Sequence, residues 1–406
     1  MKKLLLTTLI VVLTIIVSQA QSTWQIINSP VNENFVSVCF TDEMHGWIIS
    51  ETGTVVSTSD AGNSWVSSHI PNVYYESIHF SDNEHGCIVG WEETLADSSL
   101  ILVTSNGGNT WSFVNHVKVN RFNDEFFINN EIGWAVGSRG ELNMNCCYYT
   151  SDGGNTWSIQ NSILVAGAEL FGVCFRDENN GQVCGTDGAF FITNNGGSSW
   201  ALGISMPLLN LNAIYNWGAL TGCIVGEEGI ALYTINNWYQ YIETVTNTTE
   251  NLNGVSGDPV TNKLWAVGDN GTIIYTPSYL LGWTVQSSGI TENLKDIQML
   301  SETNGWAVGD NGTILHFSPL TSISYSDENK IEIYPNPVDD KLFIYLNNPI
   351  KFNQIQIFNS NGKLMHQKNI DNYTEVKIDV SKLSPAIYYL KAIGETAIVN
   401  KKLLVR

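Results

Sequence analysis

Short stretches of alternating apolar and polar residues run through most of the 406-residue chain, separated by turns rich in Gly, Asn and Asp. Typical stretches are "ESIHF" at 76–80, "FGVCF" at 171–175 and "LKDIQML" at 294–300. Alternation with period two over four to eight residues is typical of half-buried β-strands. Helical periodicity is nearly absent, so the sequence predicts an all-β protein.

The strand pattern repeats along the chain. The peptide "WAVGDNGTI" occurs twice without change, from Trp265 and from Trp306. Five weaker copies bring the number of units to seven, and they begin at Gly46, Gly86, Gly133, Gly181 and Gly222. A period of about 40 to 45 residues with four short strands per unit is typical of β-propeller blades. We therefore expect a seven-bladed β-propeller over residues 21–319.

A second motif, "SDGGNTW" from Ser151, has close copies from Ser59, Ser105 and Asn194. Its Trp belongs to a series that we interpret as one residue per blade: Trp24, Trp65, Trp111, Trp157, Trp200, Trp238 and Trp283. Asp and Asn side chains can bond the amides of such a turn, Gly takes left-handed positions, and Trp buries a large apolar face. A turn that recurs around the ring favours a structural role, which we assign to Asp60, Trp65, Trp111, Asp152, Trp157 and Trp200.

The Gly-rich units and the series of Trp residues do not begin and end together along the chain. The strand "TWQII" from Thr23 precedes the first Gly-rich unit, and the last unit has no Trp strand after it. We therefore expect the N-terminal strand to complete the last blade, which would leave no open sheet edge between the ends.

The seven-residue turn resembles the Asp-box of bacterial neuraminidase repeats. The whole unit, with "GWAVG" ahead of the box, resembles the propeller of the photosystem II assembly and stability factor family. This resemblance covers nearly 300 residues and implies the fold. It does not imply a photosynthetic role, because the same repeat occurs in many exported proteins of non-photosynthetic bacteria. The boxes near Ile235 and Pro277 depart from the pattern.

After a polar linker at 320–329, alternating stretches with Asn-Gly turns predict a small antiparallel β-sandwich over 330–406. This tail resembles the type A C-terminal sorting domain of the type IX secretion system, although Ala386 stands where that family usually has Gly. The matching residues include Tyr334, Pro335, Asn336, Pro337, Gly362 and Lys363. The resemblance implies a Bacteroidota-type bacterium, binding to the type IX machinery, and removal of the tail on export.

The first twenty residues have the pattern of a secretory signal peptide. Lys2 and Lys3 are followed by an apolar run at 4–17 and by small residues before position 21. No later stretch approaches the roughly 18 unbroken apolar residues of a spanning helix. With the tail, this segment predicts a protein that is secreted or held at the outer-membrane surface.

Charge limits the classes of partner. The net charge is −20, and residues 21–326 contain 6 basic and 30 acidic residues. Such a body repels nucleic acid and anionic membranes but accepts cations, neutral glycans or basic proteins. No cofactor and no metal site is predicted, because no Cys/His spacing suits one, while a bound cation stays open. The adjacent pair Cys146 and Cys147 leaves a vicinal disulfide open.

The turns between the second and third strands of each unit should lie at the end opposite the Trp turns. Many of them carry carboxylates, and the second and third units carry insertions there. Candidate binding residues on this face are Trp91, Glu92, Glu93, Asp97, Arg139, Glu141, Asp187, Glu227, Asp269 and Asp310.

The expected function is non-catalytic binding or scaffolding of a glycan or a surface protein. The alternative is an extracellular hydrolase of the inverting glycosidase type, which needs two suitably spaced carboxyl groups on the channel face. A sialidase needs three converging Arg side chains, and Arg139 and Arg176 are predicted at opposite ends of the propeller. No GxSxG or HExxH motif is present.

Overall fold

The computed structural model describes residues 22–93, 99–114, 121–139, 144–160, 168–258, 260–278, 281–319, 331–346, 352–359, 363–370, 375–394 and 398–406. The predicted signal peptide, the linker at 320–329, Asp97, Glu141 and Gly362 lie outside these residues. Contacts divide the chain into two compact units, one at Ser22–Pro319 and one that includes Leu320–Arg406.

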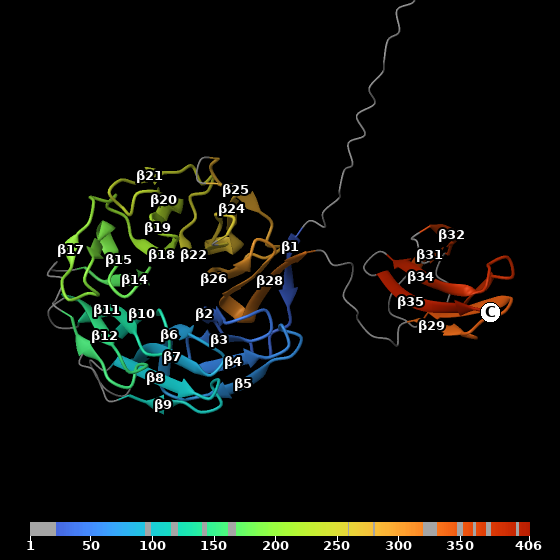
Figure 1. Cartoon of the computed structure of the whole chain (residues 1–406), viewed down its shortest axis with the longest axis horizontal. Helices are drawn as coiled ribbons and strands as arrows, with labels where there is room; N and C mark the ends of the chain where they lie inside the picture. Colours follow the sequence, from blue (N-terminus) through green and yellow to red (C-terminus); the bar gives the residue numbers. More distant parts are fainter. Residues whose placement is uncertain are drawn as a thin grey trace, which may run out of the picture. The chain divides into compact units, whose positions relative to one another are not determined.

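The described part of Ser22–Pro319 forms seven four-stranded antiparallel sheets (Figure 1). Six of them follow the chain, as β2 (Phe35–Phe40), β3 (Gly46–Ser50), β4 (Thr54–Thr58) and β5 (Val66–His69); β6 (Val73–Phe80), β7 (His85–Glu92), β8 (Ser99–Ser105) and β9 (Ser112–Phe113); β10 (Arg121–Phe127), β11 (Gly133–Arg139), β12 (Met144–Thr150) and β13 (Ser158–Ile159); β14 (Leu170–Phe175), β15 (Gly181–Gly185), β16 (Phe190–Thr193) and β17 (Ala201–Leu202); β18 (Leu211–Trp217), β19 (Thr221–Gly226), β20 (Ala231–Thr234) and β21 (Ile242–Glu243); and β22 (Leu252–Asp258), β23 (Lys263–Gly268), β24 (Ile273–Thr276) and β25 (Thr284–Gln286).

The seventh sheet joins the two ends of this unit. Its order is β1 (Ser22–Ile27), β28 (Thr313–Pro319), β27 (Asn304–Gly309) and β26 (Leu294–Ser301). β1 pairs antiparallel with β28, and Trp24 lies opposite Phe317. The predicted pairing of the N-terminal strand with the last unit is therefore present.

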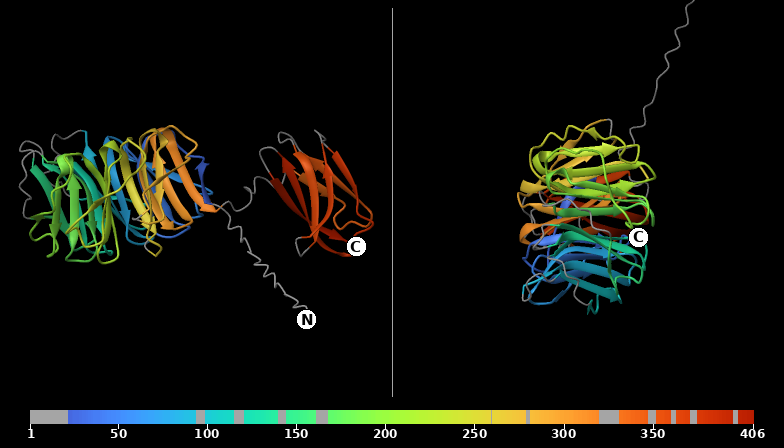
Figure 2. Two further views of the ribbon diagram at one scale, coloured as in Figure 1. Left: turned by 90° about the horizontal axis from the view of Figure 1, so that it is seen from above. Right: turned by 90° about the vertical axis from the view of Figure 1, so that its left-hand side faces the viewer.

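The sheets surround a common centre, with the first strand of each unit innermost and the Trp strand outermost (Figure 1). Figure 2 shows the same sheets from the side. The second strands are almost wholly buried, as in β3, β15 and β19, because each packs between neighbouring sheets on both faces. The outer strands are short and exposed, as in β5 and β9.

Five of the Trp turns are organised by a Thr that the predicted motif does not include. In the third sheet, Thr150 Oγ1 accepts the Gly154 N–H at 3.0 Å and donates to Asp152 Oδ1 at 2.8 Å. Asp152 Oδ1 also accepts the Thr156 N–H at 2.8 Å. Gly153 and Gly154 have φ of +70° and +84°, as predicted for left-handed positions. The same Thr contacts recur at Thr58, Thr104, Thr193 and Thr234.

Aromatic side chains join neighbouring sheets at the same end. Trp47 of the first sheet stacks on Phe80 of the second with ring centroids 3.6 Å apart, and its Nε1–H donates to the Gly107 carbonyl at 3.0 Å. Trp111 then contacts Phe80 edge-on at 5.9 Å. Trp134, Phe175 and Trp200 repeat this arrangement. The Trp turn is therefore a structural joint between blades in these units.

Trp238 was wrongly placed in the Trp series. The Thr234 hydroxyl, which marks the register, accepts the Trp238 N–H at 3.0 Å, so Trp238 occupies the second Gly position of the turn. Its φ is +62°, and its side chain is buried. Tyr241, immediately before β21, takes the place of the motif Trp. This turn contains neither Gly of the motif. Aligning the units by the spacing of their Trp residues therefore assigned Trp238 to the wrong position.

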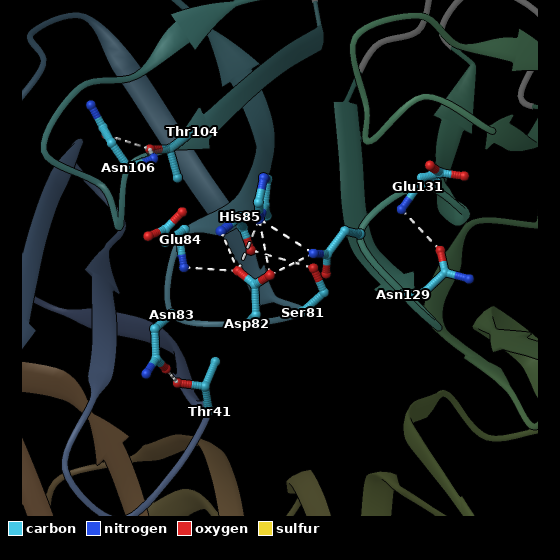
Figure 3. A network of polar contacts seen from close by, with 11 residues as sticks. Thr41, Ser81, Asp82, Asn83, Glu84, His85, Thr104, Asn106, Asn129 and Glu131 are labelled. Atoms are coloured by element: carbon cyan, nitrogen blue, oxygen red, sulfur yellow. Dashed lines mark hydrogen bonds and ion pairs between the residues drawn. The ribbon is translucent and has the colours of Figure 1, made fainter.

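The turns between first and second strands lie at this end too. Asp82 accepts the N–H groups of Glu84 and His85 at 2.8 and 2.7 Å, and its carboxylate contacts His85 Nδ1 and Asn130 of the next sheet (Figure 3). Desolvation acts to raise the pKa of Asp82, but these hydrogen bonds outweigh it and lower the pKa to about 2. Asp42, His45 and Asn83 repeat the cluster one blade earlier.

The C-terminal unit contains two antiparallel sheets among its described residues. One has the order β29 (Ile331–Tyr334), β30 (Lys341–Leu346) and β33 (Glu375–Asp379); the other has β32 (Leu364–Asn369), β31 (Phe352–Asn359), β34 (Ala386–Gly394) and β35 (Ile398–Val405). Both sheets contribute to one apolar core that includes Leu342 and Leu390.

The motif Tyr334-Pro335-Asn336-Pro337 begins at the last residue of β29 and is hydrogen-bonded to the last strand. Asn336 Nδ2 donates to the Lys402 carbonyl, and its Oδ1 accepts the Leu404 N–H, both at 2.9 Å. Lys363 donates its N–H to Asn359 Oδ1 at 2.9 Å and so closes the turn between β31 and β32. The motif residues therefore hold the ends of this unit together.

Candidate functional site

The end of the propeller opposite the Trp turns carries a charged cluster drawn from three sheets. Arg121, the first residue of β10, donates from Nε to Glu169 Oε1 at 3.1 Å, and its second guanidinium nitrogen lies 3.8 Å from Glu76 Oε1. Asn123 also donates to Glu169, at 3.0 Å. The Arg121 side chain is 41% exposed, so a ligand at this rim could reach it.

An aromatic pair adjoins this cluster. Trp91 stacks on Tyr74 with ring centroids 4.0 Å apart and an interplanar angle of 4°, because β6 and β7 place the two residues opposite each other. Trp91 also hydrogen-bonds Glu76. Desolvation raises the pKa of Glu76, and the nearby Arg121 charge opposes that shift. We call Tyr74, Glu76, Trp91, Arg121 and Glu169 the rim cluster.

Of the residues predicted in the insertions, Trp91 belongs to the rim cluster. Glu92 ends β7, and Glu93 is exposed directly after it. Asp97, Glu141 and the side chain of Arg139 lie outside the described residues. Tyr74, Glu76, Arg121 and Glu169 were not among the predicted site residues. These polar residues lie near the start of the first strand in consecutive units. That shared position in the repeat is the pattern from which the cluster could have been predicted.

The predicted acidic turns make bonds within the protein. Glu227 accepts the backbone N–H and the Nδ2–H of Asn210 at 3.0 and 2.8 Å. Asp269 accepts Asn251 and Asn253 side chains at 3.1 and 2.9 Å. Asp310 lies 3.8 Å from Lys295 Nζ. These three half-buried carboxylates bind the segments that lead into the first strands. Their oxygens already have partners within the protein and are therefore less available to a ligand.

Asp187 differs from those three carboxylates. It occupies the left-handed position of its turn, with φ of +53°, and is exposed. Its N–H donates to Asn210 Oδ1 at 3.1 Å. Glu228, Asn270 and Asn311 are the equivalent residues of the next turns and make the same bond to the following loop. Asp187 therefore presents its carboxylate to solvent while its backbone joins two blades.

The first strands enclose a central cavity of about 390 Å³. Two half-buried carboxyl groups there cap the free edge of the next strand: Asp124 Oδ2 accepts the Val173 N–H at 2.8 Å, and Asp296 Oδ2 accepts the Val38 N–H at 2.9 Å. These amides face the centre, where no further strand can pair with them. Desolvation raises the pKa of Asp124 to about 7.

Ser37 and Ser77 share the repeat position of these two carboxyls. Ser37 donates to Asp296 at 2.9 Å, and Ser77 donates to Asp124 at 3.0 Å. None of the four was among the predicted site residues, although an alignment of the first strands places them at one level of the channel.

The described Arg side chains of the propeller lie at opposite ends. Arg121 is at the rim, whereas Arg176 contacts Asp177 and Asn237 beside a Trp turn. Within the described ranges, no group of three or more His, Cys, Asp or Glu side chains is placed to hold a metal ion. No helix in those same ranges is long and apolar enough to span a membrane.

Family comparisons agree with both resemblances seen in the sequence. Residues 332–406 match the family model "Secretion system C-terminal sorting domain". Residues 16–120 match the model "Photosynthesis system II assembly factor YCF48". A search of curated protein sequences finds no match.

Solved structures extend the likeness over the whole propeller unit. YCF48 from Cyanidioschyzon merolae aligns with a TM-score of 0.60 at 17% identity, covering 73% of this chain and 99% of that one. YCF48 bound to D1 peptide gives 0.58 at 17% identity, with 73% and 94% covered. The WD40 β-propeller domain of Doa1 gives 0.57 at 11% identity, with 73% and 97% covered. The protein thus combines a propeller similar to the photosystem II assembly factor YCF48 with a C-terminal tail that matches the secretion system sorting domain.

Proposed function

We propose that this protein is an exported, non-catalytic binding or scaffold protein, released from the cell or displayed on the outer-membrane surface of a Bacteroidota-type bacterium. The observation that carries the proposal is the sorting-domain match at 332–406. In this proposal the seven sheets are the blades of a closed ring, and the C-terminal unit is a β-sandwich that the type IX machinery binds and then removes.

The export step is tested in a bacterium with a working type IX system. The full chain should appear in the medium or on the surface without residues 332–406, as measured by mass spectrometry. A chain that ends at residue 331 should stay in the periplasm. Asn336→Ala should reduce export, because Asn336 ties the motif to β35, whereas Asn369→Ala at an exposed strand end should not. An exported protein that keeps its tail contradicts the proposal.

The rim cluster is the proposed binding surface, for a glycan or for a segment of a surface protein. The stacked rings of Tyr74 and Trp91 offer an aromatic edge. Arg121 offers hydrogen-bond donors, and Glu76 and Glu169 offer acceptors. Aromatic faces next to polar groups suit sugars and peptides alike. A D1 peptide occupies one structure of the YCF48 propeller, and this supports including peptides among the ligands tested.

Binding is tested on a glycan array and a peptide array with the purified protein. Trp91→Ala and Arg121→Gln should each weaken any saturable interaction, and Phe113→Ala on an outer strand should leave it unchanged. Full retention of binding by both rim variants overturns the assignment of the surface.

One observation favours a hydrolase as the second candidate. The pKa of Asp124 is raised to about 7 in a cavity that also holds Glu125, and an inverting glycosidase needs one protonated and one ionised carboxyl group. Turnover of a polysaccharide that disappears in Asp124→Asn favours this candidate. Saturable binding without turnover favours the binding protein.

A further inference from the structure

Glu125 breaks the repeat at a core position of the innermost strand. It lies opposite Ala135 in the second strand of its blade. The equivalent residues of the other six blades, which pair in the same register, are all apolar: Val38, Ile78, Val173, Ile214, Val255 and Ile297. Six blades therefore show that the fold does not need a carboxyl group at this place.

The Glu125 carboxylate is buried without a partner. The residue is 4% exposed, and neither carboxylate oxygen has a hydrogen-bond partner among the described residues. The Ser77 hydroxyl lies nearby but donates to Asp124 at 3.0 Å. Burial of a carboxyl group without a hydrogen-bond partner is unfavourable, so its presence in one blade alone points to a ligand that supplies the missing partner.

The charges that line the cavity are mostly negative. Glu76, Asp124, Glu125 and Asp296 line it together with one Lys, Lys295, and that Lys lies within 3.8 Å of Asp310. The carboxyls are distributed over β6, β10 and β26, which lie on different sides of the centre (Figure 1). The titratable groups that interact with Glu125 are Asp124, Asp296, Cys39 and Cys87.

We propose that the channel binds a linear organic diamine, with one primary ammonium group held by Glu125 and Asp124 and the second directed toward Asp296. An ammonium group donates three hydrogen bonds, and Glu125 offers two vacant oxygens beside Asp124. A divalent metal ion would need a denser set of ligands, and the described residues do not gather three side chains that could bind one. The cavity of about 390 Å³ has room for a slender aliphatic chain.

Burial and the nearby Asp124 charge raise the pKa of Glu125 well above its usual range. The raised pKa favours the protonated carboxyl group in the empty channel, whereas pairing with an ammonium group favours loss of that proton. Diamine binding should then release a proton and become tighter as the pH rises.

The test is isothermal titration of the purified full chain with 1,4-diaminobutane. Saturable binding to the wild type is expected, with an affinity loss of about tenfold or more in Glu125→Gln, because a charge-assisted hydrogen bond is removed. Glu131→Gln is the matched control, since Glu131 is exposed on the same blade. Its affinity should equal that of the wild type.

Two further titrants define the ligand class. 1-Aminobutane should bind more weakly than the diamine, and Ca²⁺ should not compete with it. Equal affinity of wild type and Glu125→Gln overturns the proposal, as do wild-type protein that binds no diamine and competition by Ca²⁺ that depends on Glu125. Glu125→Val, which restores the residue class of the other blades, should unfold no earlier than wild type and should not bind. This site is separate from the rim cluster, so its failure leaves the proposed function untouched.

Discussion

At the scale of single residues, the informative positions are those where one blade departs from its six relatives. Glu125 puts a carboxyl group where the others have a branched apolar side chain. Trp238 has φ of +62° at a position where four other turns have Gly. Repeats supply an internal reference for both residues, because each neighbouring blade shows what the fold itself requires.

Glu125→Gln should raise the free energy of unfolding by about 1–3 kcal/mol at pH 8 and change it little at pH 4. The folded-state pKa of Glu125 is raised, so the native protein binds more protons than the unfolded chain between the two pKa values. Stability of the wild type is therefore lost as the pH rises above the unfolded value of about 4.3. Urea denaturation at both pH values measures the difference, and an equal gain at pH 4 and pH 8 contradicts the explanation.

At the scale of structural elements, the Trp turn is a hydrogen-bonded unit with a Thr at its base. Thr150 is 1% exposed; its hydroxyl donates to Asp152 and accepts the Gly154 N–H. The adjoining Trp157 packs edge-on against Phe127 of the first strand. In the next sheet, Trp200 packs edge-on against Phe175, which stacks on Trp134 of the preceding sheet. The recurring turn therefore contributes to the packing between neighbouring sheets.

Thr150→Val should destabilise the propeller by about 1–2 kcal/mol, because a side chain of similar shape leaves the Gly154 N–H without its acceptor. Thr291→Val is the control, since Thr291 is exposed and outside such a turn. Thermal or urea unfolding measures both variants. A Thr150→Val protein as stable as the control shows that the turn does not depend on this hydroxyl.

At the scale of the whole molecule, the last sheet depends on residues from both ends of the propeller unit. Trp24 is 9% exposed, contacts Phe317 with ring centroids 5.0 Å apart, and donates to Gln286 at 3.0 Å. A single strand thus connects the first residues of the unit to the sixth and seventh sheets. Pairing with β1 covers the edge of β28, which would otherwise be exposed to pairing with another strand.

Trp24→Ala should lower the free energy of unfolding by about 3–5 kcal/mol, the usual cost of truncating a buried aromatic side chain. Ile26→Ala on the same strand should change it by less than about 0.5 kcal/mol, because Ile26 is 63% exposed. Equilibrium denaturation compares the two variants. Similar small losses for both would mean that β1 does not close the ring.

Much of the architecture could be predicted before any coordinates were available. Strand alternation, the repeat period and the offset of the two motif series are local properties, and they predicted the all-β fold, the propeller class and the pairing of β1 with β28. The tail motif predicted the sorting domain in the same way. The spacing of Trp residues assigned Trp238 to the wrong position of its turn. A turn without the motif glycines can be aligned only through the hydrogen bonds of Thr234.

The sequence by itself therefore determined the elements and their order, since periodicity and turn chemistry act between residues close in the chain. Only the tertiary structure decided which charges meet and which are buried. Glu76, Arg121 and Glu169 come from three sheets, and Glu125 is buried only because neighbouring blades surround it. Burial and long-range pairing depend on how the sheets pack around the centre, and no local pattern records that arrangement.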